Sequence, residues 1–341
     1  MRRFFNDLSF WNQPIGSHPE IDPESTRITA FMAQEDDRGF WINLDRYTIP
    51  IYEVDRNTPR RKVYRIFESR LKTGIMGVLK RSEPYLHANH PLGHGPGFAE
   101  DAAAGLIPVP DYAMPDPESD AHMSLVDWES GWIWDMWYVK RRPDGDLESC
   151  TGMKIRVDGP GVFARQDFAV HNGESIHPYG PSRAAGVPAL AGTIMHQEMR
   201  EGRIAHKLGF ATQAAALQQF VSPPATWTDG GWLQGIPEGA VLQLDPALDL
   251  TQFHLSREAL IVAKALQEYG AACVDVGGGH ILYGEGLYAD PAQRTWKGLL
   301  QSDDLVKIKM PHYRVLRMEN LIHEGQGPRV PDGRYGGEAG Q

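Results

Sequence analysis

The sequence contains few of the features that stabilise small secreted proteins or place a chain in a membrane. It has only two cysteines, Cys150 and Cys273, in 341 residues, so no disulfide framework or cysteine-rich zinc site is available. No apolar run is long enough to span a membrane, and the N-terminus has no apolar stretch typical of a signal peptide. We therefore predict a cytoplasmic protein, or an exported one if a signal peptide has been removed.

Basic residues are also in the minority. The chain has 34 Lys and Arg against 44 Asp and Glu, which gives a formal net charge of -10. Nucleic acids and anionic membranes require a basic surface, so the charge disfavours both as partners. One basic stretch, residues 56–81, is either an ordinary solvated surface or a contact for an anionic polymer. The sequence leaves the oligomeric state open.

Many short apolar or alternating runs are separated by glycine and proline turns, and few helices are expected. This pattern predicts a mainly β protein, a jelly-roll or concanavalin-like β-sandwich with a few helical insertions. We expect a single domain with an N-terminal arm over residues 1–324, followed by a flexible C-terminal tail over 325–341.

Three segments have the spacing of helices: 24–36, 196–201 and 256–270. In the third, Ser256 is the expected N-cap, Ile261, Ala265 and Leu266 form an apolar stripe, and Gly270 ends the helix. The run ACVDV predicts a buried strand with HILYGEG as its hairpin neighbour. Residues 84–117 are rich in proline, glycine and histidine and predict a long lid or binding loop.

Residues 120–139 predict a β-hairpin whose turn, residues 128–131, pairs Asp127 with Trp132. One face is apolar and should cover a core. The other face is polar, and on it a sugar ring could stack against an indole. An ordinary solvated sheet face is the alternative interpretation. The residues of the polar face are Asp120, His122, Ser124, Asp135 and Trp137.

The segment from 171 to 186 is too rich in glycine and proline for a regular element, yet it carries several reactive side chains. Such segments are either binding loops or surface loops whose polar groups cap their own turns. The side chains are those of His171, Glu174, His177, Tyr179 and Arg183.

Together the hairpin face and this segment supply the groups that β-elimination of a uronate polymer requires. Arg183 would neutralise the substrate carboxylate. His122 or His177 would remove the C5 proton, and Tyr179 would protonate the leaving oxygen. Asp135 would orient His122. Asp120, Ser124, Trp137 and Glu174 would bind the polysaccharide or oligosaccharide.

Hydrolysis and noncatalytic glycan binding remain alternatives. Glycoside hydrolysis needs two carboxyl groups roughly 5 to 9.5 Å apart, whereas the predicted register separates the backbones of Asp120 and Asp135 by roughly 13 Å. Glu174 or Asp127 could complete an inverting pair. The Trp137 platform could also bind a glycan that is not cleaved.

A metal-dependent enzyme is a further alternative, although the proposed lyase needs no cofactor. His87, His90 and His94 have a spacing with which a loop could bind zinc, copper or iron. In CVDVGGGH, Asp275 and His280 flank glycines that are typical of turns or bulges rather than of a phosphate loop. His206 shares a strand face with apolar residues and is interpreted as a core histidine.

From about residue 9 to residue 317 the chain resembles a family of bacterial, largely uncharacterised β-rich proteins, many of them exported. The resemblance implies a carbohydrate-related protein and carries no catalytic assignment. It rests on the motifs SFWNQPI, SDAHMSLVD, WDMW, PSRAAGVPALAG, RIAHKLGF, PATWTDG, IPEGAVLQLDPALDL and KALQEYGAACVDVGGG.

Overall fold

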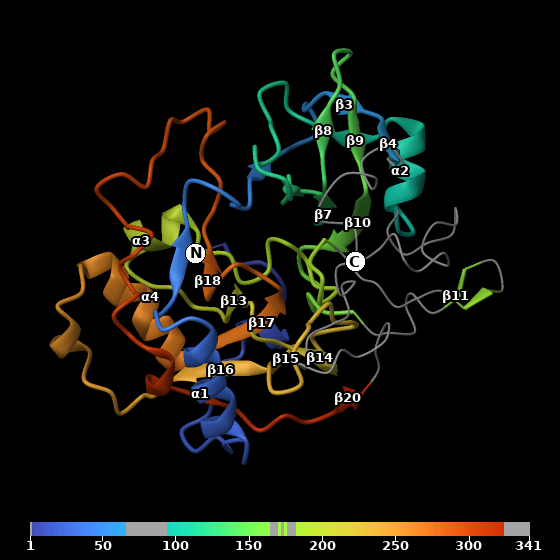
Figure 1. Ribbon diagram of the computed structural model, residues 1–341. Helices are drawn as coiled ribbons and strands as arrows, with labels where there is room; N and C mark the ends of the chain where they lie inside the picture. Colours follow the sequence, from blue (N-terminus) through green and yellow to red (C-terminus); the bar gives the residue numbers. More distant parts are fainter. Residues whose placement is uncertain (1, 66–93, 164–169, 172–173, 176–181, 324–341) are drawn as a thin grey trace, which may run out of the picture.

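Two main sheets organise the protein, whose computed structural model describes residues 2–65, 94–163, 170–171, 174–175 and 182–323 (Figure 1). The larger sheet contains, in spatial order, β1 (Trp41–Asn43), β18 (Ile281–Tyr283), β13 (Leu208–Ala211), β17 (Ala271–Asp275), β16 (Val241–Leu244) and β19 (Tyr313–Val315). The smaller sheet contains β10 (Thr151–Arg156), β7 (Trp132–Trp137), β6 (Met123–Asp127) and β2 (Ile51–Glu53).

In the described ranges, shorter strands and four α-helices surround these sheets. The strands group as β15 (Ile236–Glu238), β14 (Ala215–Val221) and β20 (Leu321–His323); β4 (Val63–Arg65), β9 (Leu147–Ser149) and β8 (Lys140–Arg141); β3 (Arg60–Arg61) and β5 (Ile107–Pro108); and β11 (Val170–His171) and β12 (Glu174–Ser175). The helices are α1 (Ser25–Glu35), α2 (Phe98–Ala104), α3 (His196–Glu201) and α4 (Arg257–Glu268), with 3-10 turns at Phe10–Asn12, Leu250–Phe253 and Met310–His312. Within the described ranges, none of these helices has the length and apolar character that crossing a bilayer demands.

A mainly β architecture is confirmed, but the jelly-roll topology is not. Both main sheets are mixed, with parallel pairs β1–β18, β13–β17 and β2–β6. The predicted hairpin between residues 272–276 and 280–286 is wrong, because β13 lies between β17 and β18 and pairs with both. Local periodicity identified the strands but not their partners, since pairing is decided by tertiary contacts.

The predicted long loop 84–117 contains α2 and β5.

The three predicted helices are confirmed, and α4 shows why its boundaries were readable. The hydroxyl of Ser256 accepts a hydrogen bond from the Ala259 N–H at 3.0 Å, which satisfies one of the free donors of the first turn. Gly270 follows the helix at φ +74°, where a Cβ would lie 2.8 Å from the Leu242 oxygen. Glycine is therefore required at this end.

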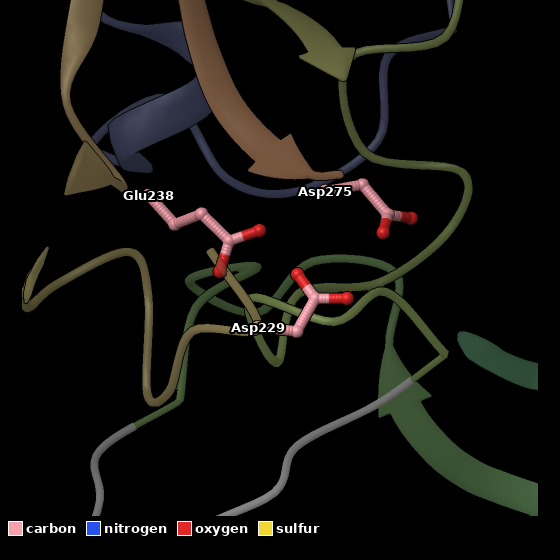
Figure 2. A group of neighbouring side chains, drawn as sticks. All are labelled: Asp229, Glu238 and Asp275. Carbon is pink, nitrogen blue, oxygen red and sulfur yellow. The ribbon is translucent and has the colours of Figure 1, made fainter. Parts of the chain in front are cut away.

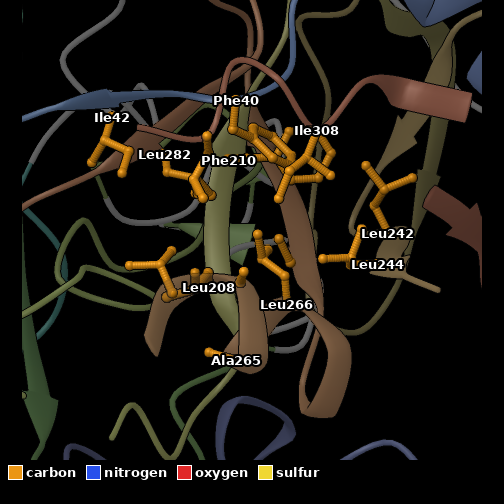
Figure 3. Packing of buried hydrophobic residues seen from close by; sticks show 14 of the residues in the cluster. Phe40, Ile42, Leu208, Phe210, Leu242, Leu244, Ala265, Leu266, Leu282 and Ile308 are labelled. Atoms are coloured by element: carbon orange, nitrogen blue, oxygen red, sulfur yellow. The ribbon is translucent and has the colours of Figure 1, made fainter. Parts of the chain in front are cut away.

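The largest core cluster lies on one face of the six-stranded sheet, under α1 and α4 (Figure 3). Phe40 packs edge-on against Phe210 and Tyr313, with both ring centroids 5.3 Å away. Leu266 of α4 and Leu282 of β18 belong to the same cluster. The apolar stripe predicted for α4 therefore faces this core.

The hairpin β6–β7 has the predicted register. Asp127 pairs with Trp132 and Ser124 with Asp135. The regular ladder ends one residue before it reaches His122, so His122 is outside it. The apolar face contributes to a core together with α2 and β5, as expected. The hairpin residues in this cluster are Met123, Leu125, Trp134 and Met136.

The prediction that the opposite face is open to solvent is wrong. Ser124 and Asp135 have no exposed surface, and His122 is 2% exposed. A second core cluster covers this face. It joins Val126 and Ile133 of the hairpin to residues of the six-stranded sheet and to the segment 182–191. The two main sheets thus share one core, and the hairpin is buried on both faces.

Asp135 fixes the segment 182–191 to the hairpin. Its carboxylate accepts hydrogen bonds from the Ser124 hydroxyl at 2.6 Å, from the Ser182 hydroxyl, and from the Ala189 N–H at 3.1 Å. Burial raises the pKa of Asp135, and these three donors oppose that rise. Both carboxylate oxygens are thereby satisfied inside the core.

Replacing Asp135 with alanine should lower the free energy of unfolding by about 3 kcal/mol or more, because three buried donors would lose their acceptor. Urea denaturation measures the change. The exposed Asp303→Ala substitution should change stability by less than about 0.5 kcal/mol. Equal effects of the two substitutions would contradict an anchoring role for Asp135.

Candidate functional site

The structure places part of the predicted catalytic set together, but inside the protein. Arg183 is 1% exposed, and its charge acts on the pKa values of Asp120, His122 and Asp135. Burial, with this charge, lowers the pKa of His122 well below its ordinary value, so the imidazole is neutral. Asp135 bonds to serine hydroxyls and a backbone N–H, not to His122 as predicted.

Arg183 is committed to local contacts rather than directed at solvent. Its Nη1 lies 3.6 Å from Oδ2 of Asp275, and its guanidinium carbon lies 3.5 Å from the centroid of the Tyr283 ring. Asp120 and Trp137 are half-buried. The Trp137 ring packs at a tilt against Tyr138, with centroids 5.5 Å apart.

The remaining predicted site residues are described only in part. His177, Tyr179, His87 and His90 lie outside the described residues. Glu174 belongs to β12, where it pairs with His171 of β11. The roles predicted for these residues stay predictions.

His94 is placed by the structure, in contact with β9 and α2. Its Nε2 lies 2.9 Å from the Ser149 hydroxyl, and its ring packs against Phe98. Burial and the charge of Arg65 lower the pKa of His94 to about 4.

A pocket of about 630 Å³ opens elsewhere on the molecule. We call it the arm pocket, because the N-terminal arm (residues 2–12) forms one wall. The turn of the hairpin, α3 and the segment 285–294 form the others. The arm is held in place by Trp11, whose indole N–H donates to the Gly161 oxygen at 2.8 Å, and by the Phe5 N–H, which donates to the Val157 oxygen at 2.6 Å.

Two buried glutamates line the arm pocket. Oε2 of Glu198 accepts from the Met195 N–H, and Oε2 of Glu285 accepts from the His196 N–H, both at 2.9 Å. Two adjacent backbone amides thus hold the two carboxylates. Because consecutive Cα atoms are 3.8 Å apart, these two carboxylate oxygens lie within about 10 Å of each other.

The two carboxylates have different surroundings. Glu198 Oε1 lies 2.9 Å from Nε2 of His206, whose Nδ1 contacts the Lys207 oxygen at 2.9 Å. Burial lowers the pKa of His206, but the charge and hydrogen bond of Glu198 outweigh it, and the net shift is upward. Both ring nitrogens therefore act as donors in the charged imidazole.

Glu285 contacts Arg294 across 2.9 Å, and it is 2% exposed. Burial raises its pKa, against the opposing effects of Arg294 and of the His196 N–H. One glutamate of the pocket is thus paired with a charged imidazole, and the other has a pKa above its ordinary value.

Aromatic rings also line the arm pocket. Trp128 stacks on Phe4 with centroids 5.4 Å apart and an interplanar angle of 8°, and its indole N–H donates to Glu53 at 3.1 Å. Tyr112 is 45% exposed and packs edge-on against Tyr52. The pocket therefore combines flat apolar surfaces with carboxylates.

A second polar cluster, which we call the carboxylate centre, consists of Asp229, Glu238 and Asp275 (Figure 2). One carboxylate oxygen of each residue lies within 4.8 Å of those of the other two. Glu238 is fully buried, the Asp275 side chain is 19% exposed, and Asp229 reaches solvent. None of the three lines the arm pocket.

Close backbone contacts bring these carboxylates together. Glu238 ends β15, and the N–H of the following Gly239 donates to the Cys273 oxygen of β17 at 2.7 Å. Gly230, next to Asp229, lies so near Ala216 that a Cβ would be 2.2 Å from its oxygen. Glycine is the residue that permits such an approach.

Mutual proximity and burial raise the pKa values of the carboxylate centre. Asp229 is exposed as a residue, but its carboxyl group lies beside the other two, and desolvation there together with the charge of Asp120 raises its pKa to about 6. Burial and the charge of Asp229 raise the pKa values of Glu238 and Asp275. These oxygen ligands are of the type that hard divalent cations prefer.

Most of these groups were not identified by sequence patterns. Asp229 and Glu238 received no role, and Asp275 was interpreted as part of a turn. Glu198 and His206 are eight residues apart, but the helix ends at Glu201, so their contact depends on the path of the following loop and not on a repeating pattern. His206 is indeed largely buried, as predicted, but it forms an ion pair that lines a pocket.

Comparisons with known protein families, with curated proteins and with solved structures found no match to this chain.

The ion pair of His206 predicts a pH-dependent stability. Its folded pKa is raised above the unfolded value of about 6.5. The pair therefore stabilises the fold fully below about pH 6.5 and loses this effect as the pH rises through the folded pKa. Substituting His206→Gln should lower the free energy of unfolding by about 1 to 3 kcal/mol at pH 5.5, and by less at pH 9.

Urea titrations at the two pH values measure this difference. The exposed His18→Gln substitution serves as the control and should have little effect at either pH. A His206→Gln effect that is the same at both pH values would show that His206 is not charged in the folded protein.

Proposed function

We propose that the protein is a carbohydrate-active enzyme that cleaves a polysaccharide by hydrolysis in the arm pocket. The proposal depends on one observation, the pair of buried glutamates, Glu198 and Glu285, held by adjacent backbone amides on one wall of the pocket. A large pocket with converging polar groups and perturbed pKa values is the default location of an active site. The glycan is the substrate class that the sequence resemblance implies.

The two glutamates are suited to different roles. Hydrolysis of a glycosidic bond requires an acid that protonates the leaving oxygen and an ionised carboxylate that acts as base or nucleophile. Burial raises the pKa of Glu285, which suits the acid. Glu198 has the His206 imidazole as its partner at 2.9 Å, which suits the base or nucleophile. Their separation of at most about 10 Å is compatible with the range of roughly 5 to 9.5 Å in such enzymes.

The aromatic rings of the pocket would hold the sugar. Pyranose rings present C–H faces that pack on flat aromatic side chains. Trp128 is fixed by its stacking on Phe4 and by its hydrogen bond to Glu53. The Arg2 guanidinium lies 5.5 Å from the centroid of its ring, so a sugar on this indole would displace Arg2. Tyr112 is exposed beside it in the same pocket.

Hydrolysis fits this pocket better than β-elimination. Elimination needs a cation that is free to neutralise a uronate and a neutral base. The three arginines that line the pocket already have carboxylate partners: Arg2 has Glu53, Arg3 has Asp7, and Arg294 has Glu285 and Asp290. His206 is positively charged and so is not a base. A neutral glycan is therefore the better substrate.

The location of the predicted lyase groups also favours hydrolysis in the arm pocket. His122 and Asp135 are buried beneath the segment 182–191, where a polymer does not reach them. Elimination would have to use other groups. We therefore place cleavage in the arm pocket and not on the hairpin face.

Substituting Glu285→Gln or Glu198→Gln should lower kcat by about 100-fold or more, because each removes one proton-transfer or nucleophilic group. Glutamine keeps an oxygen for the backbone N–H donor, so both variants should fold. Release of reducing ends from a panel of neutral polysaccharides measures kcat. Glu201→Gln, on the same helix at the exposed rim of the pocket, should retain activity.

Other results would contradict hydrolysis in distinct ways. New absorbance from unsaturated sugar ends would establish elimination. Glycan binding without any product, unchanged by either substitution, would identify a noncatalytic binding protein. Full activity of both glutamine variants would place the chemistry outside the arm pocket.

A further inference from the structure

The carboxylate centre contains a fully buried carboxyl group whose oxygens have no hydrogen-bond partner within the described part of the chain. Glu238 has no exposed surface, and neither of its carboxylate oxygens has a hydrogen-bond partner within the described part of the chain. Figure 2 shows its carboxylate directed toward those of Asp229 and Asp275. Buried carboxylates are normally hydrogen-bonded, paired with a cation or bound to a metal ion.

The centre has more carboxyl groups than cationic partners. Among the described residues, the ion pair to this centre is that of Arg183 with Asp275, at 3.6 Å, and the same guanidinium also stacks on Tyr283. Three carboxylates thus face one guanidinium. Asp120 adds a further negative charge nearby, because it acts on the pKa values of Asp229 and Asp275. A divalent cation would neutralise this excess.

The spacing of the oxygens selects the kind of cation. Ca²⁺ binds oxygen ligands at about 2.3 to 2.6 Å, so two ligands of one ion lie at most about 5 Å apart. The three carboxylate oxygens lie within 4.8 Å of one another, so an ion between them can lie within about 2.8 Å of each, and small side-chain rotations would bring all three into the range of Ca²⁺. Mg²⁺ binds at about 2.0 to 2.1 Å, so its ligands lie at most about 4.2 Å apart, whereas the longer and more flexible coordination of Ca²⁺ accommodates separations up to 4.8 Å. The ligands are all oxygens, which disfavours Zn²⁺ and Cu²⁺.

The centre is also rigid and accessible. Its ligands come from three separate segments, which the contacts of Gly239 with Cys273 and of Gly230 with Ala216 hold in place. Asp229 reaches solvent, so an ion and its remaining water ligands could enter from that side. A bound ion would link the ends of β15 and β17 to the segment before β15.

We propose that Asp229, Glu238 and Asp275 form a binding site for one hard divalent cation, with Ca²⁺ preferred. The site is separate from the arm pocket, since none of its ligands lines that pocket. Its occupancy is therefore independent of glycan cleavage and is tested by binding alone.

Isothermal titration of the full chain, after removal of metal with a chelator, tests the proposal with Ca²⁺, Mg²⁺ and Mn²⁺ added separately. We expect one Ca²⁺ per chain, weaker binding of Mg²⁺, and a rise of a few degrees in Tm when Ca²⁺ is saturating. Asp229→Asn and Glu238→Gln should each weaken Ca²⁺ binding at least about tenfold. Glu319→Gln, an exposed glutamate outside the centre, should leave it unchanged.

The Asp229→Asn variant distinguishes loss of the ion from loss of the fold. Asp229 is at the surface, so its replacement leaves no buried group unpaired and the variant should fold. No binding of any of the three cations at millimolar concentration would overturn the proposal and would mean that the carboxylates share protons instead. Binding that persists unchanged in Asp229→Asn, or a stoichiometry unaffected in both variants, would place the ion elsewhere and would also overturn it.

Discussion

The hydrogen bonds of Asp135 join the hairpin to the segment 182–191, and the arrangement of the polar core depends on them. A buried carboxylate is stable only when its oxygens are satisfied, and here two serine hydroxyls and a backbone N–H satisfy them. The segment in turn places Arg183 beside Asp275 and lines the arm pocket with Leu190 and Ala191. One interaction thus supports both polar regions of the protein.

The protein separates its acidic groups into two environments with different chemistry. In the arm pocket, Glu198 and Glu285 have cationic partners and backbone donors, and they border a cavity large enough for a ligand. In the carboxylate centre, Glu238 has neither kind of partner within the described residues. The first arrangement suits proton transfer to a substrate, and the second suits a bound cation. The carboxylate centre and the two glutamates of the arm pocket therefore need not serve the same reaction.

Sequence patterns predicted the local structure better than the sites. Ser256 and Gly270 mark the two ends of α4, and the turn at 128–131 fixes the register of β6 and β7. Both were predictable because helix caps and short turns are determined by neighbouring residues. Alternation also separated the two faces of the hairpin correctly. It could not show that the segment 182–191 covers the polar face, nor that β13 lies between β17 and β18. Asp229, Glu238 and Asp275 meet only through such long-range contacts, so no spacing revealed them.

A crystal structure of the protein soaked with a neutral oligosaccharide tests the central claim most directly. Our account predicts a sugar ring on Trp128, with a glycosidic oxygen within hydrogen-bond distance of Glu285 and with Glu198 on the opposite side of the linkage. An oligosaccharide bound instead against Trp137, with the arm pocket containing only solvent, would contradict it.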